Sequence, residues 1–439
     1  MNEDALGPIE YHARFRRYEP PVVAALSRIS AALARITDAD ILPAAENQLR
    51  SSAKVGTIHY STLIEGNELD QIEADRAVRG VLTPDTQAKI ELVNYVEALD
   101  FLDRRAEEGA AELTPEFIKE VHGIASKGLG SEESEHFKPR HEGEWRDGTA
   151  VVADRVTGTV FHRAPPPGDV PGLIAGLCEW VTKVEARPGE YPPAVIAANV
   201  HYAITDIHPF ADVNGRAARL LTVALLMRHD QVPQHIFSFE RYYAEDREAY
   251  YDALRSVRRR TLNMETWLEY FLRGLADEYE RVANKVARLA RLGLRASRAV
   301  QLTHQQEKGL VALGMAELTS FTRADYQREA KISRSAAIRD LRQLKAARVI
   351  TGRGDGPAAR YYFPAAQPEE TRGRTRKWTD EQIEADLREL CAGRTAWPPV
   401  AEFKKAGLLP LYQAVVRNGG ADEWARRLGL TRRGQEASD

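Results

Sequence analysis

The sequence predicts a mainly α-helical protein built from several domains. A chain of 439 residues is longer than one typical domain, and 43% apolar with 28% charged residues is ordinary for a globular protein. Runs typical of strands are short, whereas apolar residues recur at helical spacing through most of the first 280 positions. The first helical run follows Pro20-Pro21 and contains Leu26, Ile29, Leu33 and Ile36.

Composition argues against a membrane or secreted protein. No apolar run approaches a membrane span, and the first four residues lack the basic-then-apolar plan of a signal peptide. Only Cys178 and Cys391 occur, far apart and without ligand spacing, so neither a disulfide framework nor a cysteine metal site is expected. We therefore expect a cytoplasmic protein.

Charge is distributed unevenly along the chain. Residues 1–280 hold 31 Lys and Arg against 46 Asp and Glu, residues 281–365 hold 17 against 6, and residues 366–439 hold 13 against 12. The net charge of -3 therefore hides an acidic front and a basic middle. Different partners are expected for these two parts.

The stretch from His208 to Arg219 combines groups suited to an anionic substrate. Asn214-Gly215 is a turn signal directly before an apolar helix, so unpaired amide groups at the helix start can bind phosphate oxygens. Arg216 and Arg219 lie three positions apart on one helical face, where their planar donor groups can hold two phosphates.

Two further residues of this stretch add chemistry. Asp212 precedes the helix and could hold a Mg²⁺ that bridges the same phosphates, since Mg²⁺ prefers one or two carboxylates plus phosphate oxygens. His208 lies before the turn and could accept a proton from an attacking hydroxyl. The stretch thus predicts both an anion site and a general base.

The same stretch resembles the signature of the Fic family, H-[P/x]-F-x-[D/E]-G-N-[G/K]-R-x-x-R. The matching positions are His208, Phe210, Asp212, Asn214, Gly215, Arg216 and Arg219. Val213 departs from the pattern, because the family usually has glycine there and a β-branched residue restricts φ. An altered but working anion hole is expected, and the resemblance covers residues from about 20 to 280.

The resemblance implies a helical Fic core that transfers AMP from ATP to a Ser, Thr or Tyr hydroxyl of a target protein or of the chain itself. Pyrophosphate would be released with the help of Mg²⁺. His208 would be the base and Asp212 the metal ligand. The phosphates would be bound by the amides of Val213, Asn214 and Gly215 and by Arg216 and Arg219.

A helix expected at about residues 43–67 ends in a second motif. Its residues Ser61, Glu65 and Gly66 resemble the inhibitory pattern [S/T]-x-x-x-E-[G/N] that one Fic class carries before the core. By that resemblance Glu65 would pair with Arg219 and take the arginine away from the terminal phosphate of the nucleotide.

Two more regions follow the family layout. Short β-prone runs on either side of residues 154–158 predict a hairpin, which in the family lies over the active site and pairs with the target backbone. The hairpin residues assigned to this role are Thr159, Val160, Phe161 and His162. Tyr250 and Tyr251 resemble the family's adenine-side helix, with plain core packing as the alternative, and His201 is expected to be a packing histidine.

Residues 300–365, within the basic part of the chain, resemble a winged helix-turn-helix. Two predicted helices begin near Phe321 and Ile332, and a glycine-rich turn then lies between strands at 349–350 and 360–363. The residues expected to face DNA are Ser333, Arg334, Ser335, Arg339 and Arg353. Contacts to protein alone are the alternative for this fold.

The predicted organisation is an N-terminal helical region (1–110), a Fic core (111–280), a connecting helix (281–299), the winged helix (300–365), a linker (366–376) and a small helical domain (377–431). The last domain is similar to a helical repeat attached to homing endonucleases. Alternatives to AMP transfer are a DNA-binding regulator with a nucleotide-sensing or self-modifying core, and transfer of UMP, phosphocholine or phosphate. A homodimer is expected from the family.

Overall fold

The computed structural model describes residues 19–109, 112–134, 137–153, 160–187, 189–231, 236, 238–257, 263–299, 302–316, 320–353, 359–363, 379–392, 394–399, 402–403, 408–418 and 420–431. The chain divides into two compact units, residues 1–364 and residues 365–439. Within the described residues, no helix is long and apolar enough to cross a membrane.

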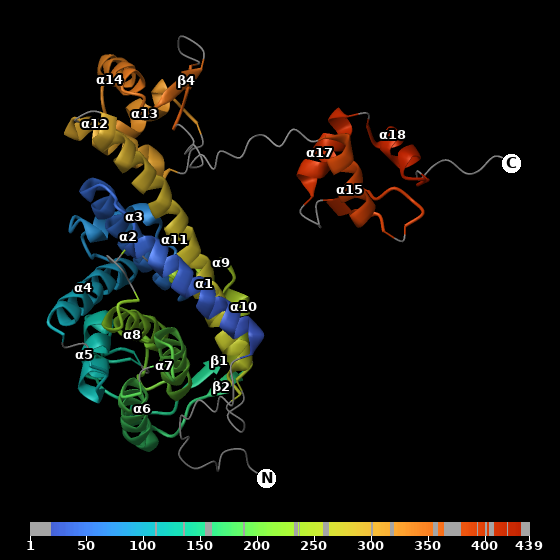
Figure 1. Ribbon diagram of the computed structural model, residues 1–439. Coiled ribbons are helices and arrows are strands. Elements are labelled where there is room, and N and C mark those ends of the chain that lie inside the picture. The colour runs from blue at the N-terminus through green and yellow to red at the C-terminus, as the bar shows by residue number, and fades with distance from the viewer. Residues whose placement is uncertain are drawn as a thin grey trace. The chain divides into compact units, whose positions relative to one another are not determined.

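The first unit is mainly helical, as the sequence predicts (Figure 1). Pro20, Pro43, Pro115 and Pro193 each occupy a first helical position, where the missing N–H costs nothing. The helices before the basic region are α1 (Pro20–Thr37), α2 (Pro43–Ile64), α3 (Gln71–Val78), α4 (Gln87–Glu107), α5 (Pro115–Ser126), α6 (Val170–Glu185), α7 (Pro193–Ile207), α8 (Asn214–Arg228), α9 (Glu240–Glu245), α10 (Arg247–Arg255) and α11 (Glu265–Ala299). Short 3₁₀ turns occur at Pro139–His141 and Pro167–Asp169.

Helices α7 and α8 form the centre of the main hydrophobic core. Almost every residue of both helices is buried, and α8 packs against α4, α5 and α7 (Figure 1). A helix that is surrounded on all sides needs apolar residues on all faces, which explains the run from Leu220 to Leu226. The loop between the two helices is therefore attached to a rigid pair.

Helix α11 packs along α1 over a long interface. Arg28 of α1 joins the two helices, because its Nε donates to Oε1 of Glu280 at 2.9 Å. The helix continues through residue 280 without a break, so the boundary predicted there does not coincide with a helix end. A turn of the chain at that point would expose the apolar face that α1 covers.

The predicted hairpin consists of β1 (Val151–Ala153) and β2 (Val160–Arg163), which pair antiparallel. Val151 lies opposite Arg163 and Val152 opposite His162, and a bulge follows at Ala153. The turn at 154–158 and the predicted flap residue Thr159 lie outside the described residues.

The basic region has a small core of its own around Leu313, Phe321, Tyr326, Leu341 and Ile350. Its elements are α12 (His304–Met315), β3 (Phe321–Thr322), α13 (Arg323–Ala330), α14 (Arg334–Ala346), β4 (Thr351–Arg353) and β5 (Arg360–Tyr362), with strand order β3-β5-β4. The prediction that residues 321–322 begin a helix is wrong, because Thr322 caps α13 and both residues pair with β5. The strand predicted at 349–350 lies at 351–353 instead, since the buried residues Val349 and Ile350 belong to the core.

The second unit is a small helical bundle. Three of its predicted helices are α15 (Asp380–Leu390), capped by Thr379, α17 (Leu409–Arg417) and α18 (Gly420–Arg427). The predicted helix around Phe403 is helical at residues 402–403, and its neighbours at 400–401 and 404–407 lie outside the described residues. Trp424 anchors the core, and its Nε1 donates to the carbonyl of Asn418 at 2.6 Å.

Candidate active site

The loop of residues 208–213 joins α7 to α8 through two residues in the left-handed region. His208 ends α7 with a φ of 50°, and Val213 precedes α8 with a φ of 64°. Asn214 closes the loop, because its Oδ1 accepts from the N–H of Phe210 and its Nδ2 donates to the carbonyl of Phe210, both at 2.9 Å. The ring of Phe210 stacks on His122 at 3.6 Å between centroids. These contacts fix the loop from inside the core.

Val213 stands where the family pattern has glycine, and its backbone is strained there. A non-glycine residue in this conformation costs about 1–3 kcal/mol, which the burial of its side chain helps to offset. Its N–H, predicted to bind phosphate, donates to Oδ1 of Asp212 at 2.7 Å. This amide can therefore meet a phosphate only after Asp212 releases it.

Glu65 and Arg219 form an ion pair across 154 residues of sequence. Arg219 is fully buried, and its Nη2 donates to Oε1 of Glu65 at 2.7 Å. Ser61 holds the same guanidinium, since its hydroxyl accepts from Nε at 2.7 Å and its carbonyl accepts from Nη2 at 3.0 Å. The end of α2 is thus bound directly to α8.

The carboxylate of Glu65 lies against the start of α8. A side chain at Gly215 would collide with Oε1 of Glu65 and would come within 3.3 Å of Nη1 of Arg219. Glycine is therefore required here for the carboxylate to approach the helix N-terminus, where the helix dipole favours an anion. The anion site predicted at this turn is filled by an anion of the protein itself.

Electrostatics favour the charged forms of this pair. Burial would raise the pKa of the Glu65 carboxyl, but the charges of Arg219 and Arg216 and the hydrogen bond from Arg219 outweigh it and lower the pKa. Burial likewise opposes the charge of Arg219, and Glu65 more than compensates, so the pKa of Arg219 is raised.

Arg216 is also buried, and it faces a different carboxylate. Its Nη1 lies 3.4 Å from Oε1 of Glu91 on α4, without the geometry of a hydrogen bond. Its Nε and Nη1 have no hydrogen-bond partner among the described residues. Buried donors without partners are costly, so this guanidinium is suited to receive acceptor oxygens from a ligand.

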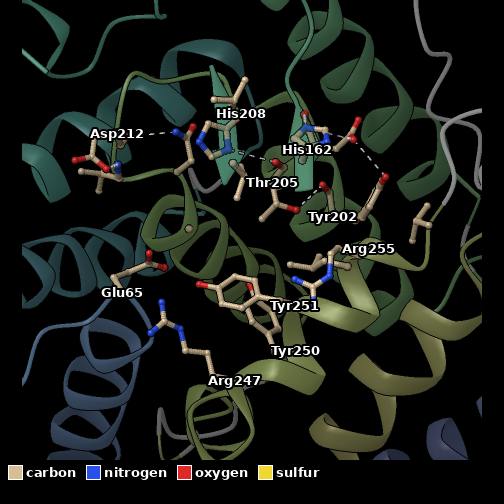
Figure 2. Close-up of a pocket in the computed structure, with 18 of the residues that line it drawn as sticks. Glu65, His162, Tyr202, Thr205, His208, Asp212, Arg247, Tyr250, Tyr251 and Arg255 are labelled. Atoms are coloured by element: carbon tan, nitrogen blue, oxygen red, sulfur yellow. Dashed lines mark hydrogen bonds and ion pairs between the residues drawn. The ribbon is translucent and has the colours of Figure 1, made fainter. Parts of the chain in front are cut away.

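Glu65, the loop after α7 and the start of α8 line a cavity of about 910 Å³ (Figure 2). Figure 2 shows His208 and His162 on one side and Glu65, Arg247, Tyr250 and Tyr251 on the other. The lining also includes Asp212, Val213, Asn214 and Gly215. The predicted base, metal ligand and turn therefore meet in one space.

His208 is held in a neutral form. Burial lowers the pKa of its imidazole to about 4. The carbonyl of Thr205 opposes this shift, and the charge of Arg146 adds to it. Its Nδ1 lies 3.4 Å from that carbonyl. A neutral imidazole at the cavity wall can accept a proton near neutral pH.

The two predicted adenine-side tyrosines differ in burial. Tyr250 is buried and its hydroxyl lies 2.8 Å from Nε2 of His201, whose Nδ1 lies 3.0 Å from Oγ1 of Thr222. The prediction that His201 is a packing histidine is thereby confirmed. Tyr251 is partly exposed in the cavity, with the guanidinium of Arg247 over its ring at 5.5 Å.

Comparison with known proteins identifies part of the chain. A sequence profile of the Fic/DOC family matches residues 112–226, which include α5 to α7, most of α8 and the loop at 208–213. This chain therefore carries a Fic/DOC domain. The solved structure of a Fic family protein of Desulfovibrio desulfuricans, 22% identical in sequence, has the same fold with a TM-score of 0.52. The match covers 80% of this chain and 97% of that protein.

The relatives of known sequence are longer than the matched region. The chain is 30% identical over 203 residues to a protein adenylyltransferase Fic of Nematostella vectensis, covering 45% of this chain and 42% of the relative. It is 27% identical over 253 residues to the protein of the same name from Aedes aegypti, covering 57% and 44%. The chain thus spans less than half the length of these relatives.

Some residues of the site lie outside the matched Fic domain. Ser61 and Glu65 precede it, and Tyr250 and Tyr251 follow it. Gly66, also part of the predicted inhibitory motif, lines the cavity and turns the chain after α2 with a φ of 95°. The fold brings these segments to the Fic domain through the common core.

The hairpin lies beside the same cavity. His162 of β2 lines it, and its Nε2 lies 2.8 Å from the carbonyl of Asp206 at the end of α7. Val160 is 41% exposed, and the side chain of Phe161 lies outside the described residues. Val151 and Val152 of β1 complete this wall.

In the basic region, the predicted DNA-facing residues lie at the surface. Ser333 caps α14 and is exposed together with Arg334, Ser335 and Arg339. Arg353 was placed in a wing turn, but it is an exposed residue of β4.

Sequence reasoning missed four polar residues that contact the site. Glu91 faces Arg216, and Arg247 lines the cavity. Nε2 of His122 lies 3.1 Å from the carbonyl of Asp212. Arg146 donates to the carbonyl of His208 at 2.8 Å. A buried histidine or arginine has no signature of its own in a helical pattern. Only the tertiary contacts reveal these roles.

Proposed function

We propose that this protein is an adenylyltransferase that transfers AMP from ATP to a hydroxyl of a protein, and that Glu65 restrains it. The observation that carries this proposal is the Glu65 carboxylate held by Arg219 at the N-terminus of α8, against Gly215. This site selects an anion by helix dipole, amides and a buried guanidinium together. The relatives named protein adenylyltransferase support ATP as the donor.

The transfer uses His208 as the general base. The neutral imidazole takes the proton of the acceptor hydroxyl, whose oxygen then forms a bond to the α-phosphorus of ATP. The bond between that phosphorus and the bridging oxygen breaks, and pyrophosphate leaves. The amides at Asn214 and Gly215 with the guanidinium of Arg216 hold the phosphates, so catalysis rests on positioning and charge.

The residues present fit a Mg²⁺ ion bound with the nucleotide. Asp212 is exposed and lines the cavity beside the anion site. No group of three or more His, Cys, Asp or Glu that could bind a metal occurs in the described residues, which suits an ion that takes most ligands from phosphates and water. Such an ion supplies charge neutralisation on the phosphates, and Asp212 would be its protein ligand.

Adenine would lie on the tyrosine side of the cavity. Tyr251 offers a partly exposed ring, and Tyr250 supports it from the core at 5.2 Å between centroids. The hairpin would align the acceptor segment on the opposite side, next to His162 and His208 (Figure 2). Donor and acceptor thus enter from two sides of one cavity.

Glu65 would restrain the reaction by competing with the nucleotide. While the carboxylate holds Arg219, the terminal phosphate of ATP loses its guanidinium partner and meets a like charge instead. Because Ser61 also holds Arg219, loss of the Glu65 carboxylate alone would leave the guanidinium in place beside the start of α8.

The position of the label in ATP tests the reaction. A Glu65→Gly protein incubated with Mg²⁺ and ATP radiolabelled on the α-phosphate should become labelled, whereas label on the γ-phosphate should leave as pyrophosphate. Retention of γ-label would show phosphate transfer. Labelling by UTP in preference to ATP would show a different donor.

The acidity of His208 gives a pH prediction. Because burial lowers its pKa to about 4, the imidazole stays neutral well below the ordinary value of about 6.5. The kcat/KM of the Glu65→Gly protein for ATP should therefore stay level from pH 8 to about 5.5. A decline centred near 6.5 would show that His208 is solvated or is not the base.

A second function, DNA binding, is favoured by the surface of α14. Its exposed charged residues are all basic, namely Arg334, Arg339, Arg342 and Lys345, and the exposed Arg348 follows the helix. Asp340 is buried and accepts from the hydroxyl of Tyr326 at 3.3 Å. A helix with this face can enter a major groove and contact phosphates. The chain would then combine DNA binding with nucleotide transfer.

Salt dependence tests this second function. With about four phosphate contacts, affinity for duplex DNA should fall roughly a hundredfold between about 50 and about 200 mM salt. Replacing Arg334 and Arg339 with alanine should reduce the slope, whereas the exposed Arg388 of the second unit provides a control. No retention of DNA at low salt would rule out this role.

A further inference from the structure

Arg146 is a buried arginine whose guanidinium bonds only to main-chain carbonyls. It is 3% exposed. Its Nε donates to His208 at 2.8 Å, Nη1 to Gly148 at 2.8 Å, and Nη2 to Pro165 at 2.5 Å and to Ile207 at 3.4 Å. Among the described residues it has no carboxylate partner, so this charge is stabilised by carbonyl dipoles alone.

The four carbonyls belong to three separate segments. Ile207 and His208 lie at the end of α7, Gly148 lies before β1, and Pro165 lies after β2. The main-chain N–H of Arg146 adds a bond to the carbonyl of Pro209 at 3.0 Å. A guanidinium is planar with donors in fixed directions, so one side chain sets the spacing of these segments.

This spacing bears on the candidate base. His208 has a positive φ of 50°, a conformation that a non-glycine residue holds only where the surroundings impose it. The carbonyl of His208 accepts a hydrogen bond from Arg146, and the imidazole of the same residue lines the cavity. The two segments that flank the hairpin, at Gly148 before β1 and at Pro165 after β2, are bound to the same guanidinium. The hairpin is therefore tied to the backbone of His208.

We infer that Arg146 is a positioning residue that holds the hairpin and His208 in one register, so that a hydroxyl aligned along the hairpin reaches the imidazole. This inference rests on the proposed transfer reaction. Arg146 touches neither nucleotide nor acceptor, and it acts through two backbone segments. A misplacement of about 1 Å between them is enough to cost roughly a hundredfold in rate.

Arg146→Lys in the Glu65→Gly protein tests the inference. Lysine keeps the charge but cannot reach three segments at once, so transfer at saturating ATP should fall roughly 10- to 100-fold. The Kd for ATP should change less than about threefold, because the phosphate site lies on α8. Arg140→Lys is the matched control, since Arg140 is exposed and pairs with Asp147.

Hydrogen exchange gives a readout that does not depend on activity. In Arg146→Lys, exchange should rise in the segments that flank the hairpin and in residues 207–210, and stay unchanged in α2 and α8. Transfer as fast as in the parent, or ATP affinity lost in parallel with transfer, would overturn the inference. If the Glu65→Gly parent transfers nothing, the proposed function fails. Unchanged exchange in both segments that flank the hairpin would separately overturn the inference that Arg146 holds the hairpin to His208.

Discussion

Replacing Glu65 with glycine is expected to raise the rate of AMP transfer at least about tenfold. The carboxylate makes one charge-assisted hydrogen bond to Arg219, worth about 1.5–3 kcal/mol, and fills the start of α8. Each 1.4 kcal/mol corresponds to a tenfold change, so its removal should favour the productive nucleotide pose by that factor or more. Initial rates of labelling from α-labelled ATP measure the effect.

The same change should destabilise the protein. Arg219 would stay fully buried and keep its bonds to Ser61, but it would lose its carboxylate partner, at a cost of about 1–3 kcal/mol in the free energy of unfolding. Saturating ATP should restore part of this loss. Glu248→Gln is the matched control, because Glu248 lines the cavity as an exposed carboxylate away from Arg219. Equal rates for the parent and the Glu65→Gly protein, with the fold intact, would refute restraint by Glu65.

His208→Ala is expected to lower transfer by about 10² to 10⁴ in the Glu65→Gly background. The imidazole lines the cavity and is held neutral, so its loss removes the group that takes the hydroxyl proton. ATP affinity should persist, because the phosphate site on α8 is retained. Kinetics and equilibrium binding on the same preparation separate these effects.

His229→Ala serves as the comparison for that change. His229 is half-buried and lies 2.9 Å from Glu185 through Nε2, outside the cavity. Its replacement should leave transfer within about twofold, because His229 lies outside the cavity. A His208→Ala protein that transfers AMP at the parent rate would assign the base to another group.

The local parts of the site were predictable from the sequence. The turn at Asn214-Gly215, the helix after it and the placement of His208 and Asp212 follow from a few adjacent residues. The pairing of Glu65 with Arg219 was predicted only through the resemblance to the Fic family, because periodicity carries no information about partners 154 positions apart.

The remaining features depend on contacts that no local pattern encodes. Arg146 bonds to a carbonyl 62 positions away, and His122 to one 90 positions away, and in sequence both resemble ordinary polar residues. The continuity of α11 across residue 280 likewise depends on α1 covering its apolar face. Tertiary packing decided these features.

Intact-mass spectrometry tests the central claim most directly. Wild-type, Glu65→Gly and Glu65→Gly/His208→Ala proteins would each be incubated with ATP and Mg²⁺. The account predicts that the Glu65→Gly protein gains the mass of one or more AMP groups while the other two stay nearly unmodified. An unmodified Glu65→Gly protein that still binds ATP, or a gain that persists without His208, would contradict it.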